Sequence, residues 1–438
     1  MLRTTLLATF GSLSLVLPQL TAQQLTEGFS ATTATLPAGT SNVLTTDLGR
    51  IYFDGFDLTL DGNGSMSPVS LLTFSSSTYG SFTTPIGATE VLFGESSNGG
   101  IWSVPLNGSQ PQLIATVPYN YDVVMLDDNR ALISAKTGGF SAPDNDVMFV
   151  DLITGQTQLL ANFPGASGPL AIDSQGNVYY ATAPGSFPAP AGTVSVLRIT
   201  STDIDNALAT NTVLGTANAQ VVISNLDAAG DIAFDDDGDL FFVDWFNNQI
   251  GEINDADSNF ATLAPTLIDY AGSGLNGSLL QFTRTAVGPQ IFEPFQPIAG
   301  QLLVHETDYV TISQIRTVSA RRPELTSSVT SPITTGPFSL TSLNGPANGI
   351  GLMAFAMTSS GGPLSVQVAG FEQPLLIDAA FSTSPIIVPL TFDLTGTTSL
   401  TIQNPGFATI LDATAQTVCF ALNGALGTSQ PLSLQIGQ

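Results

Sequence analysis

The stretch at residues 230–253, GDIAFDDDGDLFFVDWFNNQIGEI, constrains the fold of this chain more than any other. Apolar, β-prone residues form two runs, at 232–234 and 240–243, and Asp236-Asp237-Gly238 supplies a tight turn between them. A second turn at Asn247-Asn248 leads into a third apolar run. The pattern predicts a β-meander of the kind that forms one blade of a β-propeller.

Counterparts of this unit recur along the chain. The strand position of Leu240 is found again at spacings of 40, 41, 46, 62 and 62 residues, at Ile51, Val91, Leu132, Val178, Leu240 and Leu302. These spacings fit four-stranded blades with insertions in the later copies, so six anchors predict six blades. Further strands are predicted at 101–104, 147–150, 157–160, 194–197 and 312–315, and a short helix at 202–209. Whether residues 25–45 close the ring by pairing with the last blade stays open.

The best copies resemble a known family. Ile232, Gly238, Leu240 and Asp244, followed by Asn247-Asn248-Gln249-Ile250, are similar to the repeat of NHL-type six-bladed propellers and of their relatives, the sugar-lactone lactonases. The resemblance covers residues 41–320. It implies a fold that many functions share.

The composition changes after Arg321-Arg322-Pro323. Residues 324–438 carry almost no charge, are rich in Ser, Thr, Gly and Pro, and alternate in polarity at 364–368 and 400–402. About seven short strands are expected there, which predicts a β-sandwich. This part resembles the accessory sandwich modules of secreted bacterial proteins. We therefore predict an all-β chain with a signal peptide at 1–22, a six-bladed β-propeller at 23–322 and a β-sandwich at 324–438.

The N-terminus predicts export. Arg3, an apolar run at 6–17 and Leu20-Thr21-Ala22 match a secretory signal cleaved after Ala22. This run is too short for a membrane span, and no later stretch approaches the necessary length. Cys419 is the single cysteine, so no intramolecular disulfide forms, and its apolar neighbours predict a buried strand. We expect a monomer that is secreted or bound at the cell surface.

The charge balance excludes some partners. Acidic residues outnumber basic ones 35 to 9, and the net charge is −26. Such a surface repels phosphate backbones and anionic lipids, so we expect binding neither to nucleic acid nor to membranes. An extracellular protein or carbohydrate is the expected partner.

Candidate site residues follow from blade geometry. In an antiparallel hairpin the start of the first strand and the end of the second strand lie on the same rim, so residues at these positions converge around the channel. Starts of first strands contribute Asp122 and Asp231. Ends of second strands contribute Asp54, Glu95, Lys136, Thr182, Asp244, His305 and Glu306.

Several carboxylates on one rim could hold Ca²⁺, which takes six to eight oxygen ligands. The candidate metal ligands are Asp122, Asp231, Glu95 and Asp244. In the lactonase relatives a cation at this place polarises the ester carbonyl and activates water, and Asp122 and Asp231 are the nearest matches to the acidic ligand before a first strand. Asp231 stands one residue away from the position in that pattern, and Gly168-Pro169 occupies the place of the asparagine ligand.

Other features have structural explanations beside functional ones. The run 235–239, DDDGD, could bind calcium or simply form a polar turn, and 61–65 lacks a closing glutamate at Leu72. Aromatic residues could stack on sugar rings or fill the space between blades, namely Trp102, Tyr119, Tyr121 and Trp245. Asn107 and Asn276 begin glycosylation patterns that also fit hairpin turns.

The leading hypothesis is a non-catalytic exported propeller that recognises a protein or a glycan through its channel face and requires no cofactor. It rests on candidate rim acids without a complete nucleophile, base and oxyanion set, because His305 is the single histidine and no Gly-x-Ser-x-Gly motif occurs. The alternatives are a calcium-dependent hydrolase of lactones or related esters, and a structural surface or matrix protein.

Overall fold

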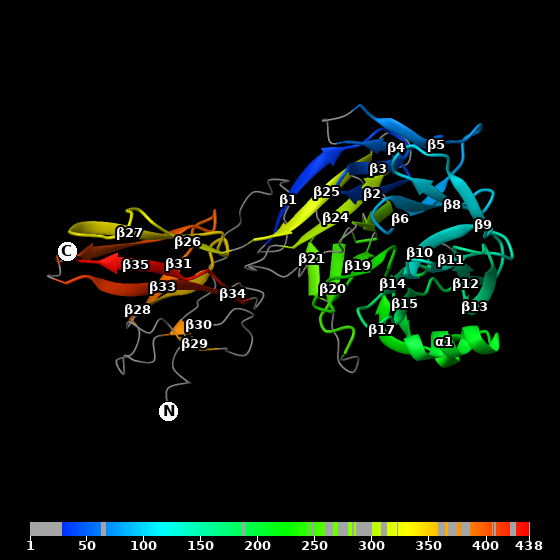
Figure 1. Cartoon of the computed structure of the whole chain (residues 1–438). Helices are drawn as coiled ribbons and strands as arrows, with labels where there is room; N and C mark the ends of the chain where they lie inside the picture. Colours follow the sequence, from blue (N-terminus) through cyan, green and yellow to red (C-terminus); the bar gives the residue numbers. More distant parts are fainter. Residues whose placement is uncertain are drawn as a thin grey trace, which may run out of the picture.

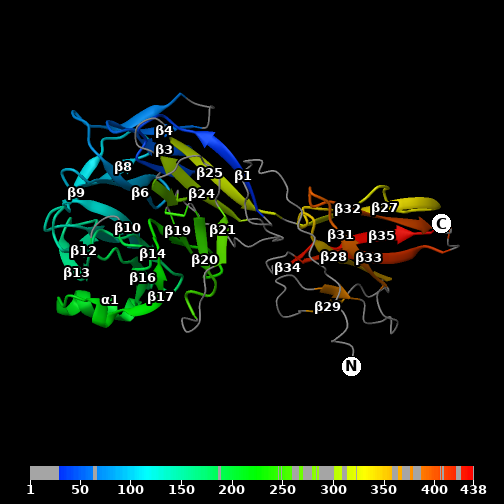
Figure 2. The same cartoon turned by 180° about the vertical axis from the view of Figure 1, so that it is seen from behind.

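The computed structural model describes residues 29–437 with gaps at 63–66, 186–188, 245, 248, 259–265, 270–278, 283, 286–299, 308–312, 322, 358–363, 367–374, 378–385, 405, 407–408 and 421–425. Figures 1 and 2 show two bodies of strands, one with β1 to β25 and the other with β26 to β35. In the first body the sheets surround a common centre, toward which β6, β10 and β14 lie (Figure 1). This is the predicted β-propeller.

Four sheets of the propeller each consist of four consecutive strands, and every neighbouring pair is antiparallel. They contain β6 (Gly80–Ile86), β7 (Glu90–Glu95), β8 (Gly100–Pro105) and β9 (Gln112–Thr116); β10 (Asn120–Asp127), β11 (Arg130–Ala135), β12 (Asp144–Asp151) and β13 (Thr157–Pro164); β14 (Leu170–Ile172), β15 (Val178–Ala181), β16 (Val194–Ile199) and β17 (Gln220–Leu226); and β18 (Ile232–Phe234), β19 (Leu240–Asp244), β20 (Gln249–Ile253) and β21 (Thr266–Asp269).

The first and last sheets of the propeller differ from this pattern. The first contains β2 (Asn42–Thr46), β3 (Gly49–Phe53), β4 (Asp57–Asp61) and β5 (Val69–Thr73), with β23 (Arg284–Thr285) parallel to β2. The last has the order β22 (Leu279–Phe282), β24 (Gln301–Thr307), β25 (Ser313–Ala320) and β1 (Phe29–Thr35). Because β1 pairs antiparallel with β25 from Phe29↔Ala320 to Thr35↔Gln314, the N-terminal strand completes the last sheet.

The strand positions predicted from the repeat are confirmed. All six anchors lie in the second strand of a sheet, namely in β3, β7, β11, β15, β19 and β24. The predicted third strands correspond to β8, β12, β16 and β25, and the run 157–160 begins β13. The structure therefore contains six sheets between β1 and β25 in its described residues.

Apolar side chains pack between neighbouring sheets all the way round the ring. Phe53 of β3 contacts Phe93 of β7 with ring centroids 4.9 Å apart, and Phe163 of β13 stacks on Tyr180 of β15 at 4.6 Å. The described residues form six such shared clusters, including one between the first and last sheets that contains Val43. Since each sheet buries both faces against its neighbours, the sheets pack radially.

Aspartates shape the turns between first and second strands. Asp173 Oδ1 accepts the backbone N–H groups of Gln175 and Asn177, each at 2.9 Å. Asp235 Oδ1 does the same for Asp237 and Asp239, each at 3.0 Å. An aspartate that accepts from the backbone two and four residues later stabilises a tight turn locally. The acidic run 235–239 is thus a strand-to-strand turn.

The insertion between β16 and β17 contains the helix α1 (Ser201–Thr210) and the short 3₁₀ turn η1 (Thr216–Asn218). Thr200 caps α1, because its Oγ1 accepts the N–H of Asp203 at 3.1 Å. The buried Ile204 and Ala207 pack into the cluster between the third and fourth sheets. Within the described ranges no helix is long and apolar enough to cross a membrane.

The second body contains two layers of strands and a small additional hairpin. One layer has the order β26 (Glu324–Ser327), β27 (Gly336–Leu343) and β32 (Thr398–Asn404). The other contains β31 (Ile386–Thr391), β28 (Ile350–Met357), β33 (Leu411–Phe420), β34 (Leu426–Thr428) and β35 (Leu432–Ile436), and the hairpin pairs β29 (Leu364–Val366) with β30 (Leu375–Ile377).

Both layers bury their side chains in one core, in which Phe338 and Leu340 of β27 meet Met353 of β28. Cys419 is a buried free thiol on β33, as predicted, and burial raises its pKa to about 12. The last strand of the propeller ends at Ala320 and the first strand of the second body begins at Glu324. A division into independent domains at this point stays a prediction.

Candidate functional site: the channel pocket

A pocket lies where the sheets of the propeller converge. We call it the channel pocket. Every sheet of the described propeller contributes to its wall, and the lining residues are Asn42, Val43, Ser81, Phe82, Thr83, Tyr121, Asp122, Pro169, Gly230, Asp231 and His305. Five sheets contribute residues at or just before the start of their first strands. The convergence expected from blade geometry is therefore present.

Hydrogen bonds between side chains tie the first strands together around this pocket. Thr83 Oγ1 on β6 donates to Asn42 Oδ1 on β2 at 2.6 Å. Ser81 Oγ, also on β6, donates to Asn120 Oδ1 on β10. These four side chains are buried, so each bond replaces the water that its groups have lost. The pocket wall is thus held by a polar network that crosses from sheet to sheet.

Asp122 continues this network to the next sheet. Its Oδ1 accepts the N–H of Val123 at 2.8 Å, and its Oδ2 accepts the N–H of Leu170, the first residue of β14, at 2.7 Å. The Asp122 side chain is buried, with 7% of its surface exposed. The two backbone N–H groups satisfy both oxygens of this buried carboxylate, and the bond to Leu170 links β10 to β14. Asp122 therefore has a structural task in the pocket wall.

Asp231 occupies the corresponding position before β18. It is buried, and its Oδ1 accepts the N–H of Ile232 at 2.9 Å, as Asp122 does from Val123. Asp122 and Asp231 stand 109 positions apart in the sequence, and the repeat predicts that they lie on the same rim. Both line the channel pocket.

Tyr121 reaches across the pocket. Its hydroxyl donates to the backbone oxygen of Gly230 at 3.1 Å, which connects β10 to the segment before β18. Burial raises the pKa of Tyr121 well above 10, and the charges of Asp231 and Asp122 raise it further. The phenol is therefore neutral and acts as a hydrogen-bond donor in the pocket wall.

His305 enters the pocket from β24, the second strand of the last sheet. Its Nε2 lies 2.8 Å from Ser313 Oγ, and only 1% of its surface is exposed. Burial lowers the pKa of His305 to about 3, so the imidazole is neutral at physiological pH. The other ring nitrogen, Nδ1, has no hydrogen-bond partner among the described residues.

Asn42 supplies a second buried atom of this kind. Its Oδ1 accepts from Thr83, but its Nδ2 has no hydrogen-bond partner within the described part of the chain. Asn42 was not predicted as a site residue, because an asparagine at the start of a strand carries no chemical signature in the sequence. Asn42 Nδ2 and His305 Nδ1 are thus unpaired polar atoms in the wall of one pocket.

The acids at the ends of second strands do not line the channel pocket. Asp54 Oδ1 accepts the N–H groups of Phe56 and Asp57 at 3.0 and 2.9 Å. Asp244 Oδ1 likewise accepts from Phe246 and Asn247, both at 3.1 Å. Each carboxylate closes the turn that follows its own strand.

Three other predicted residues at these positions also have local partners. Glu95 Oε1 accepts the N–H of Asn98 at 2.9 Å and a hydrogen bond from Thr78 Oγ1. Lys136 Nζ donates to the backbone oxygens of Ala142 and Gly165 at 2.6 and 3.0 Å. Thr182 Oγ1 accepts the N–H of Ser195 at 3.0 Å.

Glu306 lies inside the last sheet and does not line the pocket, although its neighbour His305 does. Side chains of consecutive strand residues point to opposite faces, so the two cannot share one site. Glu306 Oε1 accepts from Arg316 Nε at 3.1 Å, and Gln314 Nε2 donates to Oε2. Both members of this ion pair are almost fully buried.

The predicted calcium ligands are only partly brought together. Asp122 and Asp231 share the channel pocket, whereas Glu95 and Asp244 close turns elsewhere. Among the described residues no group of three or more His, Cys, Asp or Glu side chains is placed to hold a metal ion. Ca²⁺ takes six to eight oxygens, so Asp122 and Asp231 would supply only part of its ligand set.

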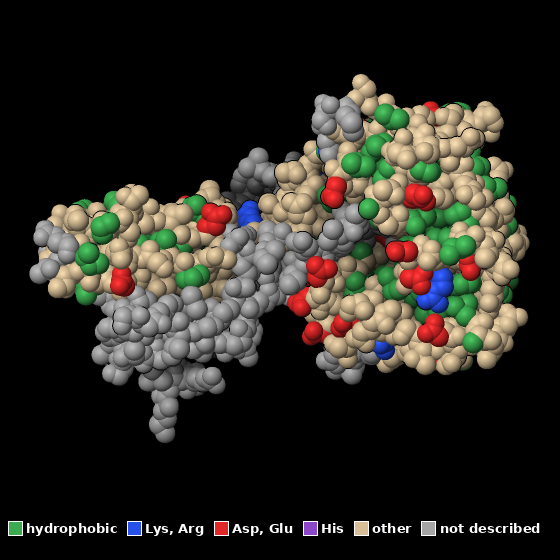
Figure 3. All heavy atoms as spheres, in the orientation of Figure 1, with side chains coloured by type: hydrophobic (Ala, Val, Ile, Leu, Met, Phe, Trp, Pro, Cys, Tyr) green, Lys and Arg blue, Asp and Glu red, His purple; other side chains and the backbone are tan. Residues whose placement is uncertain are grey.

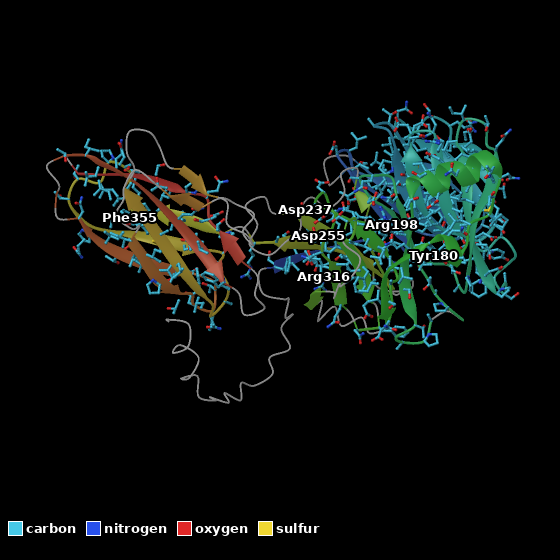
Figure 4. The ribbon with its side chains drawn as sticks, turned by 90° about the horizontal axis from the view of Figure 1, so that it is seen from below. Tyr180, Arg198, Asp237, Asp255, Arg316 and Phe355 are labelled. Atoms are coloured by element: carbon cyan, nitrogen blue, oxygen red, sulfur yellow. The ribbon has the colours of Figure 1, made fainter. Side chains whose placement is uncertain are left out.

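A second acidic region lies at the opposite end of the β18–β19 hairpin. Asp239 is buried and accepts the N–H of Asp255 at 2.6 Å. Burial, with smaller contributions from the charges of Asp235, Asp237 and Asp255, raises the pKa of Asp239 to about 7. Figure 4 shows Asp237 and Asp255 in neighbouring loops. More widely, acidic side chains are scattered over the face in Figure 3, and basic ones are few.

The remaining candidates from the sequence either have structural positions or lie outside the described residues. Trp102 on β8 packs edge-on against Phe74 with ring centroids 6.0 Å apart, which is the packing alternative for aromatic residues. Asn107 Oδ1 accepts the N–H of Ser109 in an exposed turn. The signal peptide at 1–22, most of the 61–65 loop, Trp245 and Asn276 lie outside the described residues.

No protein-family model and no curated protein matches this chain. Solved β-propeller structures resemble it at low identity. A gluconolactonase from Xanthomonas campestris is 11% identical, with 66% of this chain and 90% of that chain covered and a TM-score of 0.45. Regucalcin, a calcium-binding protein from Agrobacterium tumefaciens, is 13% identical, with 65% and 92% covered and a TM-score of 0.42. A catalytically inactive virginiamycin B lyase from Staphylococcus aureus with quinupristin is 12% identical, with 66% and 99% covered and a TM-score of 0.42. Similarity at this level leaves the function to be argued from the residues of this chain.

Proposed function

We propose that this protein is exported and binds an extracellular protein or carbohydrate through the channel pocket, without transforming it. The observation that carries the proposal is the pair of unpaired polar atoms, Asn42 Nδ2 and His305 Nδ1, which are buried in the wall of one pocket. A buried polar atom without a partner costs about 1–3 kcal/mol. A ligand that supplies the missing partners would offset this cost.

The chemistry of the pocket favours a ligand without negative charge. Asp122 and Asp231 line the wall, and a neutral imidazole adds no positive charge to balance them. Asn42 Nδ2 requires an acceptor, and His305 Nδ1 accepts or donates according to its tautomer. A hydroxyl or an amide group meets both requirements, because each can donate and accept. Sugars and peptide ends both carry such groups.

The other polar groups of the pocket are engaged in hydrogen bonds within the protein, which favours a binding function over catalysis. Asp122 holds the backbone of β14, Tyr121 holds Gly230, and His305 Nε2 is engaged with Ser313. Groups committed in this way shape a rigid pocket, and a rigid pocket loses little conformational entropy when a ligand enters. The export signal expected at 1–22 supports an extracellular location for this binding.

The substitution Asn42→Asp tests the proposal. It keeps the oxygen that accepts from Thr83 and replaces the unpaired donor by an acceptor, so we expect at least about tenfold weaker binding at temperatures where the variant is folded. Because Asn42 is buried, the added charge also lowers the melting temperature. Binding of the full mature chain to immobilised glycans and extracellular proteins, followed by calorimetric titration of each hit, measures the effect. Asn107→Asp adds the same charge in an exposed turn and is the matched control. Equal binding by Asn42→Asp and the wild type would refute the proposal.

Calcium-dependent hydrolysis of lactones or related esters is the second candidate. It is favoured by the presence of both Asp122 and Asp231 in the channel pocket. Lactone turnover that is lost on chelation and restored by Ca²⁺, and that is abolished in Asp231→Ala but not in Asp236→Ala, would replace the binding proposal by this one.

A further inference from the structure

The exposed aromatic side chains of the described propeller all lie on one rim. They are Phe56, Tyr79, Tyr119, Phe140 and Phe246. We call them the aromatic rim. Tyr79 and Tyr119 directly precede the first strands β6 and β10, and the other three lie in loops between second and third strands. Both kinds of loop lie at the end of the propeller at which the first strands start. Residues at these strand starts line the channel pocket.

The opposite rim carries exposed side chains of another kind. Leu48 lies in the turn between β2 and β3, and Ile153 in the turn between β12 and β13. Phe140 and Ile153 are similarly exposed, at 80% and 75%. Exposed apolar area is therefore present at both ends of the propeller. Only the rim on the pocket side presents flat aromatic rings among the described residues.

A second pocket connects the channel pocket to this rim. We call it the side pocket, and it is lined in part by Thr182, Asp227 and Phe246. It shares Tyr121, Pro169 and Gly230 with the channel pocket. Two adjoining pockets that share Tyr121 can each receive a polar group of one ligand.

Two details link other rim residues to the same place. Tyr79 lies near enough to Tyr121 for its charge to raise the pKa of Tyr121, after burial and the charges of Asp231 and Asp122. Tyr119 has φ 52°, and it is the single described residue with positive φ that is not Gly, Asn or Asp. A large residue in this region is strained, so its ring is held at the rim at a conformational cost.

From these observations we propose that the partner is an uncharged glycan of two or more sugar units. A hydroxyl group at its end enters the channel pocket and pairs with Asn42 Nδ2 or His305 Nδ1. A polar group of the following unit enters the side pocket beside Phe246, and the aromatic rim stacks on the C–H faces of the sugar rings. Sugar rings combine apolar faces with hydroxyl edges, which matches aromatic rings set among polar loops. The net charge of −26 disfavours anionic glycans. This inference rests on the binding function proposed above.

The test compares the two rims. Phe246→Ser and Phe140→Ser remove rim rings, and Ile153→Ser and Leu48→Ser remove exposed apolar side chains from the opposite rim. Neutral, anionic and single-unit sugars are titrated into the full mature chain by calorimetry, with peptides as a further arm. We expect affinity for neutral oligosaccharides to fall about tenfold in Phe246→Ser and less in Phe140→Ser, with no change in the two controls.

The outcomes separate the two proposals. If Asn42→Asp abolishes binding but the rim variants do not weaken it, the glycan-rim inference is wrong and the pocket proposal stands. Pocket-dependent binding of a peptide or an anionic glycan with no neutral sugar bound also overturns the inference. If Asn42→Asp has no effect, the pocket proposal itself fails. Because the rim residues are exposed, unchanged melting temperatures show that lost binding is not lost folding.

Discussion

Carboxylates buried within the sheets and carboxylates in the turns have different tasks in this propeller. Glu306 and Asp122 lie inside or between sheets, and each bonds to a group distant in the chain: Arg316 on the next strand or Leu170 in the next sheet. Asp54 and Asp173 accept from backbone N–H groups within four residues of themselves. The first kind joins elements, and the second kind shapes one turn. A sequence pattern that marks acidic residues does not distinguish the two.

The largest expected effect comes from the buried ion pair. Glu306→Ala removes the carboxylate that accepts from Arg316 in a nearly dry environment, so we expect the free energy of unfolding to fall by about 3–5 kcal/mol. Denaturant titration measures this loss. Asp128→Ala in the exposed β10–β11 turn is the control and should change stability by less than about 0.5 kcal/mol. Replacing both partners by apolar residues, Glu306→Leu with Arg316→Met, should recover part of the loss. A loss in Glu306→Ala no larger than that of the control would remove the distinction between the two kinds of carboxylate.

Asp239 shares a feature with each of the two groups, because it is a buried carboxylate at the edge of a turn. Its pKa is about 7 in the folded state, above its ordinary value of 3.8, so the folded protein retains this proton between about pH 4 and pH 7. The stability that this retained proton contributes is fully present below about pH 4 and is lost progressively as the pH rises from about 4 to 7. Asp239→Asn keeps an acceptor for the N–H of Asp255 and cannot ionise. We therefore expect its melting temperature to exceed that of the wild type at pH 8, with a smaller difference at pH 5.

Thermal unfolding at several pH values checks this expectation. Asp236→Asn removes a charge from an exposed residue of the same turn and should show a weaker dependence on pH. A difference between Asp239→Asn and the wild type that stays constant from pH 5 to pH 8 would contradict the proposed titration of Asp239.

The smallest effect is expected for a turn carboxylate. Asp54→Ala removes an acceptor from the N–H groups of Phe56 and Asp57, but this turn is partly exposed and water can replace the lost bonds. We expect a loss of about 1 kcal/mol or less, measured by denaturant titration. Asp54→Asn, which keeps the accepting oxygen, should lie close to the wild type. A loss as large as that of Glu306→Ala would show that turn carboxylates and buried ion pairs contribute equally to the free energy of unfolding, which would contradict the comparison.

Much of the fold could be predicted from the sequence. The anchors at Val178 and Leu240 identify second strands because apolar alternation and a glycine turn act over a few residues. The closure of the ring was left open, since pairing of Phe29 with Ala320 depends on two strands at opposite ends of the propeller. No local pattern in β1 marks that partner.

The candidate site was predictable only in part. The repeat placed Asp122 and Asp231 in one wall, because both precede a first strand. It also selected Asp244 and Glu306, whose carboxylates are directed to a turn and to a buried arginine. The position of a residue along its strand predicts at which rim of the propeller it lies. The direction of each side chain depends on the neighbouring strand and sheet.

The amino-acid sequence by itself determined the strands, the capped turns and the acidic surface, because these arise from interactions between residues a few positions apart and from composition. Only the tertiary structure decided which polar atoms meet in the channel pocket. Asn42 and His305 stand 263 positions apart, and both line one pocket because the first and last sheets of the ring pack against each other. The same packing excludes water from them, which is why their unpaired nitrogens point to a ligand.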